Sequence, residues 1–242
     1  MKAIFDIGNT TFKCGLFSET EMINFFREST LEEILTQLAP YEDEITSGIV
    51  ASVRKLSTTQ RELLNNRPFS ILWFNVRTPL PMANAHDFPD SLGVDRLAAV
   101  VEAVNSSSDR PLLVIDVGTA VTYEFISADG TYLGGNISPG IQLRFKALND
   151  YTSALPLIDK DGPRMEIGVD TDTAIRNGVL LGIEHEIMGY IREMMKKDPR
   201  ILVFLTGGDS ISFDDKLKKC IFADKFLVLR GLNRILDYNN DK

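Results

Sequence analysis

A short segment near the N-terminus recurs about halfway along the chain. Residues 2–10, KAIFDIGNT, match residues 112–120, LLVIDVGTA, and Asp6 and Asp116 stand at the same place in the two copies. Each copy is an apolar run that ends in Asp-x-Gly, followed by a small polar residue and a second apolar run. Because a stacked repeat array needs three or more copies, two copies favour a duplicated domain with a cleft between its halves.

The rest of the 242-residue sequence alternates between strand-like and helix-like patterns, which is typical of an α/β protein. We expect one domain over residues 1–109 and a second over 110–242. In the first, the patterns predict strands over 2–6, 12–17, 22–27, 45–53 and 69–74, helices over 30–38, 58–66 and 92–104, and a loop over 77–89. In the second, they predict strands over 112–116, 121–126 and 201–205, a glycine-rich segment over 134–140, and helices over 141–149, 171–195 and 214–219.

The charge and cysteine content exclude several classes of protein. Asp plus Glu number 34 against 26 for Lys plus Arg, a net charge of −8, and such a surface repels nucleic-acid phosphates. Cys14 and Cys220 lack any metal-ligand spacing, which disfavours a zinc site or a disulfide scaffold and fits a reducing compartment. Neither a signal-peptide pattern nor an apolar run of about 18 residues is present. We therefore expect a cytoplasmic protein with no nucleic-acid or membrane partner.

A carboxylate at the end of a buried strand, followed by a glycine turn, suits phosphate chemistry. Asp6 would project from the strand end, where it can hold Mg²⁺ directly or through water. Gly8 permits a tight turn whose N–H groups approach phosphate oxygens, and Lys13 supplies a positive charge. The alternative is a hairpin whose aspartate merely caps the turn. The second copy, at Asp116, favours the functional interpretation.

A third acidic position lies at the start of the helix expected over 92–104. In one interpretation, Asp95 is a carboxylate stabilised by the dipole of that helix. In the other, Asp95 deprotonates a substrate hydroxyl while the Arg96 guanidinium holds an anionic or polar group of the same substrate. The spacing alone leaves both interpretations open.

Further sequence features restrict which type of phosphate-binding site the chain can form. Thr206-Gly207-Gly208-Asp209 follows a buried strand, and its glycines permit the approach of a nucleoside or simply make a tight turn. The sequence has no Gly-Lys dipeptide and no two glycines separated by one residue, which excludes a P-loop, a Rossmann fingerprint and a protein-kinase glycine loop. His86 and His185 have no metal-ligand spacing.

Together these motifs resemble the type III pantothenate kinases, a family of the acetate-and-sugar-kinase, heat-shock and actin superfamily. The resemblance spans nearly the whole chain and rests on six segments in order: Asp6-Ile-Gly-Asn-Thr, Gly93-Val-Asp-Arg, Asp116-Val-Gly-Thr-Ala, Gly134-Gly-Asn-Ile-Ser-Pro-Gly, Asp170-Thr-Asp-Thr-Ala-Ile and Thr206-Gly-Gly-Asp. It implies a homodimer whose chains each contain two ribonuclease-H-like, actin-like ATPase domains. It also implies that the protein phosphorylates pantothenate with ATP to 4′-phosphopantothenate, the first step of coenzyme A synthesis.

The resemblance further implies roles for individual residues. The segment Asp6, Ile7, Gly8, Asn9, Thr10, Thr11, Phe12 and Lys13 would cradle the ATP phosphates, with Asp6 near Mg²⁺, and Thr119 would contact ATP. Asp95 would be the base on the pantothenate hydroxyl, within a substrate segment of Gly93, Val94, Asp95 and Arg96. Asp116 would bind a monovalent cation, K⁺ or NH₄⁺, and Thr171 would reach pantothenate across the dimer interface.

Two positions depart from the family pattern. His86 stands where the family often has a tyrosine, and the usual Asn-Thr pair reads Asp170-Thr171, with Thr173 as a second candidate for the substrate threonine. Two alternative functions are a catalytically silent regulatory protein of the same fold and a kinase of another small alcohol. The presence of all three carboxylates, at positions 6, 95 and 116, favours the pantothenate kinase.

The long helix expected over 171–195 bears on dimerisation. Its apolar residues include Ile175, Val179, Ile183 and Ile187. If these residues are exposed, they favour a helix-mediated dimer, whereas burial within one chain would explain them equally well.

Overall fold

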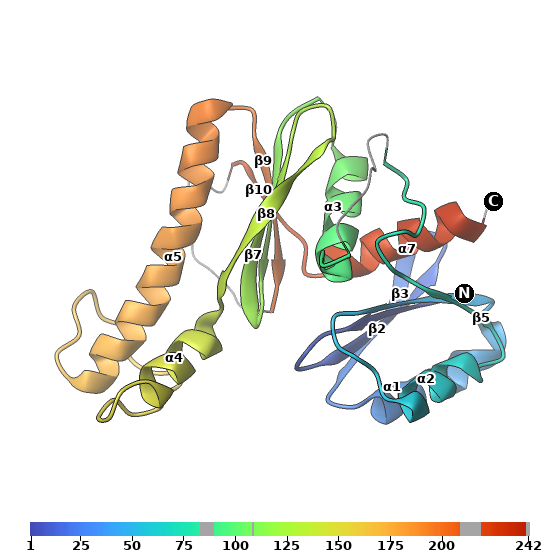
Figure 1. Cartoon of the computed structure of the whole chain (residues 1–242), viewed down its shortest axis with the longest axis horizontal. Helices are drawn as coiled ribbons and strands as arrows, with labels where there is room; N and C mark the ends of the chain where they lie inside the picture. Colours follow the sequence, from blue (N-terminus) through green and yellow to red (C-terminus); the bar gives the residue numbers. More distant parts are fainter. Residues whose placement is uncertain (83–89, 108, 209–218, 241–242) are drawn as a thin grey trace. The chain divides into compact units, whose positions relative to one another are not determined.

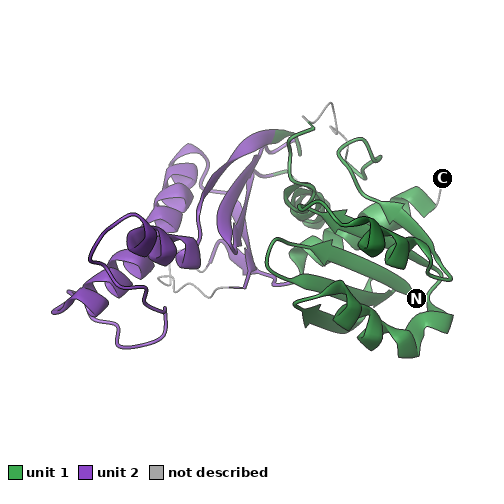
Figure 2. Ribbon diagram, turned by 60° about the horizontal axis from the view of Figure 1, so that its bottom comes forward, with its two compact units in different colours: residues 1–109, 130–132, 226–242 green, residues 110–129, 133–225 purple. Residues whose placement is uncertain are grey.

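The computed structural model describes residues 1–82, 90–107, 109–208 and 219–240. The chain forms two compact units (Figure 2). The first comprises residues 1–109, 130–132 and 226–242, and the second residues 110–129 and 133–225. The C-terminal segment therefore belongs to the first unit, whereas the second domain expected from the sequence runs over 110–242. Within the described ranges, no helix is long and apolar enough to cross a membrane.

The first unit is a five-stranded sheet with helices on both faces (Figure 1). Its elements are β1 Lys2–Ile7, β2 Phe12–Ser18, β3 Glu21–Glu28, α1 Leu31–Leu38, η1 Ala39–Glu44, β4 Ser47–Ser52, α2 Thr58–Asn65, β5 Ser70–Trp73, α3 Val94–Ser106 and α7 Leu227–Asn240. The strand order is β3-β2-β1-β4-β5. Strand β1 pairs antiparallel with β2 and parallel with β4.

Every residue of β1 is buried, because helices cover both faces of the strand. Ala3, Phe5 and Ile7 share one core cluster with the apolar residues of α1. Side chains alternate along a strand, so Lys2 and Asp6 point to the opposite face. There the Lys2 Nζ lies 2.5 Å from Asp237 Oδ1 of α7. The side chain of Asp6 therefore lies on the face that α3 and α7 cover.

The second unit is also a five-stranded sheet, with order β10-β9-β6-β7-β8. Its elements are β6 Leu112–Val117, β7 Ala120–Ile126, β8 Tyr132–Pro139, α4 Ile141–Asp150, α5 Thr171–Lys197, β9 Leu202–Gly207 and β10 Ile221–Ala223. Helices α4 and α5 lie on one side of this sheet (Figure 1). Their apolar residues pack with Leu113, Ile115 and Val117 of β6. Asp116 therefore points to the sheet face away from α5.

The two sheets share one topology, which confirms the duplication expected from the repeat. In each sheet, the first strand of an antiparallel hairpin is central and pairs in parallel with a later strand, β4 or β9. Ile7 pairs with Phe12, so residues 8–11 form the first hairpin turn. Val117 pairs with Val121, and Gly118 and Thr119 form the second turn, before β7 begins at Ala120. The second turn is therefore shorter than the first.

Three helices begin with reciprocal caps that the sequence encodes locally. In each capping box the N-cap side chain accepts a hydrogen bond from the backbone N–H three residues on, and the side chain there accepts from the N-cap N–H. The pairs are Thr30 with Glu33 in α1, Ser57 with Gln60 in α2, and Asp170 with Thr173 in α5. These caps explain why the predicted helix starts agree with the structure to within one residue.

Four elements lie outside the predicted set: η1, β8, β10 and α7. Strand β8 includes the glycine-rich segment, with Gly134 at a φ of +110°. An edge position tolerates its glycines and Pro139, because one side of an edge strand needs no ladder partner. The helix expected over 214–219 and residues 83–89 of the expected loop lie outside the described residues. The four apolar residues of α5 singled out for dimerisation are buried within their own unit.

Helices α3 and α7 cross at Gly231, and this close crossing generates a prediction about stability. A Cβ at position 231 would collide with the Ala98 carbonyl oxygen. We expect Gly231→Ala to lower the free energy of unfolding by about 1–3 kcal/mol, because the two helix backbones must separate.

Chemical denaturation measures this change. Gly189→Ala in α5 is the matched control, because a Cβ there meets nothing within 4 Å. The control should be neutral or stabilising by up to about 1 kcal/mol, since alanine favours helix. Equal stability of Gly231→Ala and the wild-type protein would contradict the close crossing.

Candidate functional site

Asp6 lies near the carboxyl end of β1 and forms an ion pair inside its own hairpin. The aspartate is 5% exposed. Lys13 is its cross-strand partner, and the Lys13 Nζ donates to Asp6 Oδ2 at 2.9 Å. Such a buried carboxylate requires a positive partner. The lysine that the sequence analysis assigned to the phosphate segment is therefore held in place by the aspartate of that segment.

The turn over residues 8–11 presents backbone and small polar groups. The N–H of Gly8 donates to the Thr11 carbonyl at 3.0 Å, while Asn9 and Thr10 are exposed. A Cβ on Gly8 would make only an ordinary contact, 3.4 Å from the Thr11 oxygen. Local packing therefore does not require glycine here, and a bare backbone suits the close approach of a ligand. Ile7 and Phe12 are buried, so only their backbones face this turn.

A second positively charged side chain, that of Arg54, lies near this turn but belongs to none of the sequence motifs. Arg54 follows β4, and its guanidinium lies 5.0 Å from the centre of the Phe12 ring. The neighbouring Val53 N–H donates to the Ile7 carbonyl at 3.2 Å, which fixes this loop at the end of β1. Carboxyl ends of parallel neighbouring strands meet at one sheet edge, and this rule would have found Arg54.

Asp95 lies in the first turn of α3, after the N-cap residue Gly93. Its Oδ1 accepts from the Arg96 N–H at 2.8 Å. Burial raises the pKa of the Asp95 carboxyl, and the negative charge of Asp6 raises it further. The N–H and the guanidinium of Arg96 oppose this rise in pKa. The charge of Asp6 thus acts on Asp95, although the two residues are 89 positions apart in sequence.

The side chain of Arg96 has a partner from a distant strand. Its Nη2 donates to the Tyr132 hydroxyl at 3.3 Å, and both residues are half-buried. Tyr132 begins β8 but belongs to the first compact unit. The tyrosine stands outside the sequence motifs, and its role in orienting Arg96 becomes visible only in the fold. The other substrate residues expected here, Gly93 and Val94, are half-buried at the start of α3.

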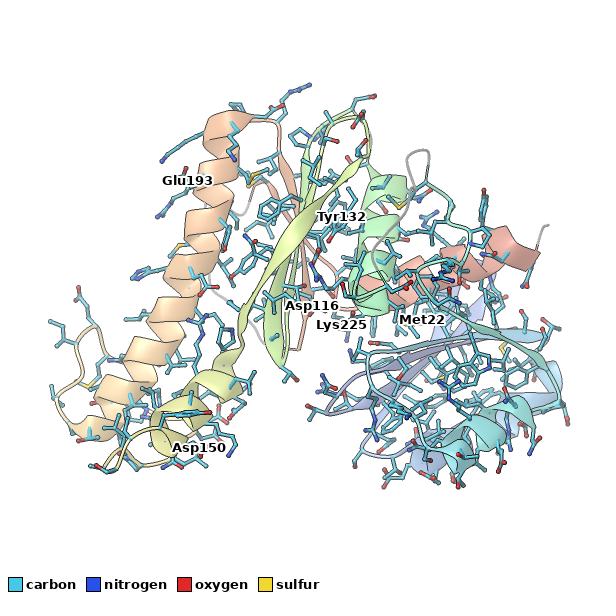
Figure 3. The ribbon with its side chains drawn as sticks, in the orientation of Figure 1. Met22, Asp116, Tyr132, Asp150, Glu193 and Lys225 are labelled. Carbon is cyan, nitrogen blue, oxygen red and sulfur yellow. The ribbon has the colours of Figure 1, made fainter. Side chains whose placement is uncertain are left out.

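In the second unit, Asp116 lies near the carboxyl end of β6 (Figure 3). Its cross-strand partners are Thr122 on β7 and Thr206 on β9. Directly paired residues point to the same sheet face, so one carboxylate and two hydroxyls share that face. The position that holds Lys13 in the first hairpin is occupied here by the oxygen-bearing side chain of Thr122. This donor set is chemically suited to a cation.

The Gly118–Thr119 turn is packed against two other glycines. The Gly140 N–H donates to the Thr119 carbonyl at 3.1 Å, and a Cβ on Gly140 would collide with the Gly118 carbonyl. Gly207 has a φ of +112°, and a Cβ on it would collide with the backbone of Val117. Thr119 itself is exposed. At Gly207 the tight-turn interpretation therefore accounts for the glycine.

The start of α5 separates the two candidate threonines. The Thr173 hydroxyl donates to Asp170 Oδ1 at 2.7 Å and is buried in the helix cap. The same hydrogen bonding lowers the pKa of Asp170. Thr171 is exposed, which leaves it as the candidate for a ligand contact. His185 is exposed on α5, while His86 and Asp209 lie outside the described residues.

Comparisons with known proteins are consistent across sequence and fold. The family model for type III pantothenate kinase matches residues 3–193. A Bacteroides fragilis protein named type III pantothenate kinase is 48% identical over 242 residues, covering 100% of both chains. A Phocaeicola vulgatus protein of the same name is 49% identical over 240 residues, covering 99% of both.

Two solved structures resemble the whole chain. One, a conserved Campylobacter jejuni protein assigned to the Baf family of transcriptional activators, has a TM-score of 0.61 and 22% identity, covering 99% of this chain and 100% of that one. The other, component A of (R)-2-hydroxyglutaryl-CoA dehydratase from Acidaminococcus fermentans, has a TM-score of 0.54 and 12% identity, covering 100% and 99%. These likenesses concern the fold alone, that of actin-like ATPases with duplicated ribonuclease-H-like domains.

The raised pKa of Asp95 generates a prediction about stability. The folded protein binds a proton at Asp95 more tightly than the unfolded chain does, so the charged carboxylate disfavours folding above its raised pKa. We expect Asp95→Asn to be at least as stable as the wild-type protein at pH 7. Its advantage should shrink as the pH falls through the raised pKa, where Asp95 becomes neutral.

Denaturant titrations at several pH values measure this difference. Asp90→Asn is the matched control, because the Asp90 side chain is 75% exposed and pairs with Arg77 at the surface. The control should change stability by less than about 0.5 kcal/mol. A marked loss of stability in Asp95→Asn at pH 7 would show that the Asp95 charge stabilises the fold.

Proposed function

The chain is a member of the type III pantothenate kinase family, and we propose that it transfers the γ-phosphoryl group of ATP to the hydroxyl of pantothenate. The product is 4′-phosphopantothenate, and the reaction opens coenzyme A synthesis in the cytoplasm. One observation within the first unit carries the proposal. Asp6 points to the sheet face that α3 and α7 cover, and Asp95, whose pKa is raised by burial and by the charge of Asp6, lies in the first turn of α3.

Asp95 is the base in this proposal. Its carboxylate takes the proton from the pantothenate hydroxyl while the hydroxyl oxygen attacks the γ-phosphorus, and the bond to the ADP oxygen breaks. A raised pKa makes the carboxylate a better proton acceptor near neutral pH. Arg96, oriented by Tyr132, supplies a positive charge for the pantothenate carboxylate.

The turn over residues 8–11 and the neighbouring cations bind the ATP phosphates. Backbone N–H groups and the hydroxyls of Thr10 and Thr11 donate to phosphate oxygens, while Lys13 and Arg54 offset their charge. The described residues contain no cluster of three carboxylates, histidines or cysteines. Asp6 nevertheless fits Mg²⁺, directly or through water, because proteins hold this ion through one or two carboxylates plus substrate phosphates and water. Bound Mg²⁺ would neutralise charge on the phosphates of ATP.

The second unit supplies the monovalent-cation site and a nucleotide contact. Asp116, with the hydroxyls of Thr122 and Thr206 on the same sheet face, binds K⁺ or NH₄⁺ in this proposal. ATP carries about four negative charges, so carboxylates near it need cations between them and the phosphates. Thr119, exposed in the turn beside Asp116, contacts ATP.

We also propose a homodimer, in which Thr171 reaches the pantothenate of the partner subunit. The second unit has a set of exposed large apolar side chains: Leu133, Ile137, Tyr151, Leu157, Ile167 and Val169, each at least 62% exposed. Exposed apolar surface of this kind is typical of protein interfaces. Ile167 and Val169 lie just before Thr171, so an interface there would place Thr171 beside the partner.

Asp95→Asn tests the catalytic proposal. We expect ADP release in the presence of pantothenate, Mg²⁺ and K⁺ to fall by about 10²-fold or more, because a carboxamide does not accept the proton. ATP binding should be nearly unchanged. A coupled assay measures the rate, and calorimetric titration measures the binding.

Asp90→Asn is the control and should retain the wild-type rate. Unchanged turnover in Asp95→Asn would remove Asp95 from the role of base. A wild-type protein that binds ATP without turnover would instead support the silent regulatory function.

Asp116→Ala tests the monovalent site. We expect wild-type turnover to rise with K⁺ or NH₄⁺ relative to Na⁺, and the variant to lose most of this dependence because a cation ligand is gone. Thr122→Val, which removes only a hydroxyl, should shift the half-activating K⁺ concentration upward. An activation curve of Asp116→Ala that superimposes on the wild-type curve would contradict the assignment.

A further inference from the structure

A hydrogen-bonded network in the second unit surrounds Glu186, a residue that the motifs do not include. Glu186 lies in α5, and its Oε1 accepts from the Tyr123 hydroxyl at 2.7 Å and the Ser138 hydroxyl at 2.5 Å. Its Oε2 accepts from Arg144 Nη2 at 2.5 Å. One carboxylate therefore joins β7, β8, α4 and α5.

This network favours the charged form of the Glu186 carboxyl group. Burial raises the pKa of its carboxyl, but hydrogen bonds from Arg144, Ser138 and Tyr123 lower the pKa below its ordinary value. The Glu186 and Arg144 side chains are only 26% and 20% exposed. Removal of one partner would leave the other charge largely buried, which is costly.

Arg144 links this carboxylate to the backbone at the corner between β8 and α4. Its Nε donates to the Pro139 carbonyl at 2.7 Å. The Arg144 N–H donates to the carbonyl of Gly140, the N-cap residue of α4, at 3.0 Å. The N–H bond is the first helical bond of α4, whereas the side chain binds the Pro139 carbonyl and the Glu186 carboxylate at once, a fork geometry that a lysine does not reproduce.

The same corner packs against the Gly118–Thr119 turn. Gly140 donates to the Thr119 carbonyl, and its backbone lies so close to the Gly118 carbonyl that a Cβ does not fit. A shift of the corner therefore moves this turn. The contacts form one continuous path from Glu186 through Arg144 and Pro139–Gly140 to Thr119.

We propose that Glu186 and Arg144 are positioning residues for nucleotide binding, because they hold the β8–α4 corner that sets the place of the Gly118–Thr119 turn. The inference rests on the proposed contact between Thr119 and ATP. Neither residue touches substrate in this account, and their effect is on nucleotide affinity rather than on proton transfer. The path consists of direct hydrogen bonds and backbone contacts within one compact unit.

Glu186→Ala in the full-length protein tests the proposal. The primary readout is calorimetric titration with a non-hydrolysable ATP analogue and Mg²⁺, and the second compares KM for ATP with KM for pantothenate. We expect the affinity for the analogue to fall by about 10-fold and KM for ATP to rise by a similar factor. Networks of packed and hydrogen-bonded residues change binding at a distant site by about this amount. KM for pantothenate should change less than about twofold.

Two further variants separate positioning from general destabilisation. Glu186→Gln keeps acceptors for Tyr123 and Ser138 but loses the charge opposite Arg144, so its affinity should lie between those of the wild-type and Glu186→Ala proteins. It also keeps the test open if Glu186→Ala does not fold. Glu193→Ala, on an exposed stretch of α5, is the control and should match the wild-type protein in every binding parameter.

The possible outcomes are distinct. Wild-type analogue affinity in folded Glu186 variants, or equal shifts in both KM values, would overturn the positioning role and leave the proposed function intact. Loss of analogue affinity in a protein that fails to phosphorylate pantothenate would overturn the proposed function but support the positioning role. A wild-type protein that does not bind the analogue would contradict both.

Discussion

The burial of the Asp95 carboxylate, within reach of the negative charge of Asp6, is the constraint on which the proposed site depends. Burial raises the pKa of Asp95, the negative charge of Asp6 raises it further, and the fold keeps this arrangement with cations around it. Lys13 pairs with Asp6, the guanidinium of Arg96 favours the charged form of Asp95, and Arg54 is stacked on Phe12 beside the turn. Such an arrangement opposes stability and suits the proposed site, in which these residues bind metal-bound phosphates and accept a proton.

The duplicated topology gives the chain two hairpin ends with different chemistry. Each has an aspartate near the end of its central strand, but lysine is the cross-strand partner in the first and threonine in the second. The cross-strand position therefore supplies a cation at the first end and a hydroxyl at the second. The Glu186 network is a further feature of the second unit, where the charged residues that hold the β8–α4 corner lie on α5 and α4.

The sequence predicted the elements whose patterns lie within a few neighbouring residues and missed those that depend on distant contacts. The repeated strands β1 and β6 and the capped helices were predictable, because apolar runs and capping boxes lie within a few residues. The family resemblance is confirmed by full-length relatives. Strand β8 was missed because an edge strand tolerates glycine and proline, and the packing of α7 with the first unit depends on contacts across the whole chain. Tyr132 was missed for the same reason, because its partner Arg96 is distant in sequence, whereas Arg54 could have been found from the rule that neighbouring parallel strands end at one sheet edge.

The most direct test of the account is product analysis in a mixture of acceptors. Purified protein would be incubated with ATP, Mg²⁺, K⁺ and equal amounts of pantothenate, glycerol and a hexose, and the products analysed by mass spectrometry. The account predicts one phosphoryl group on pantothenate and none on the other alcohols. Phosphorylation of another alcohol in preference to pantothenate, or no phosphorylated product at all, would contradict it.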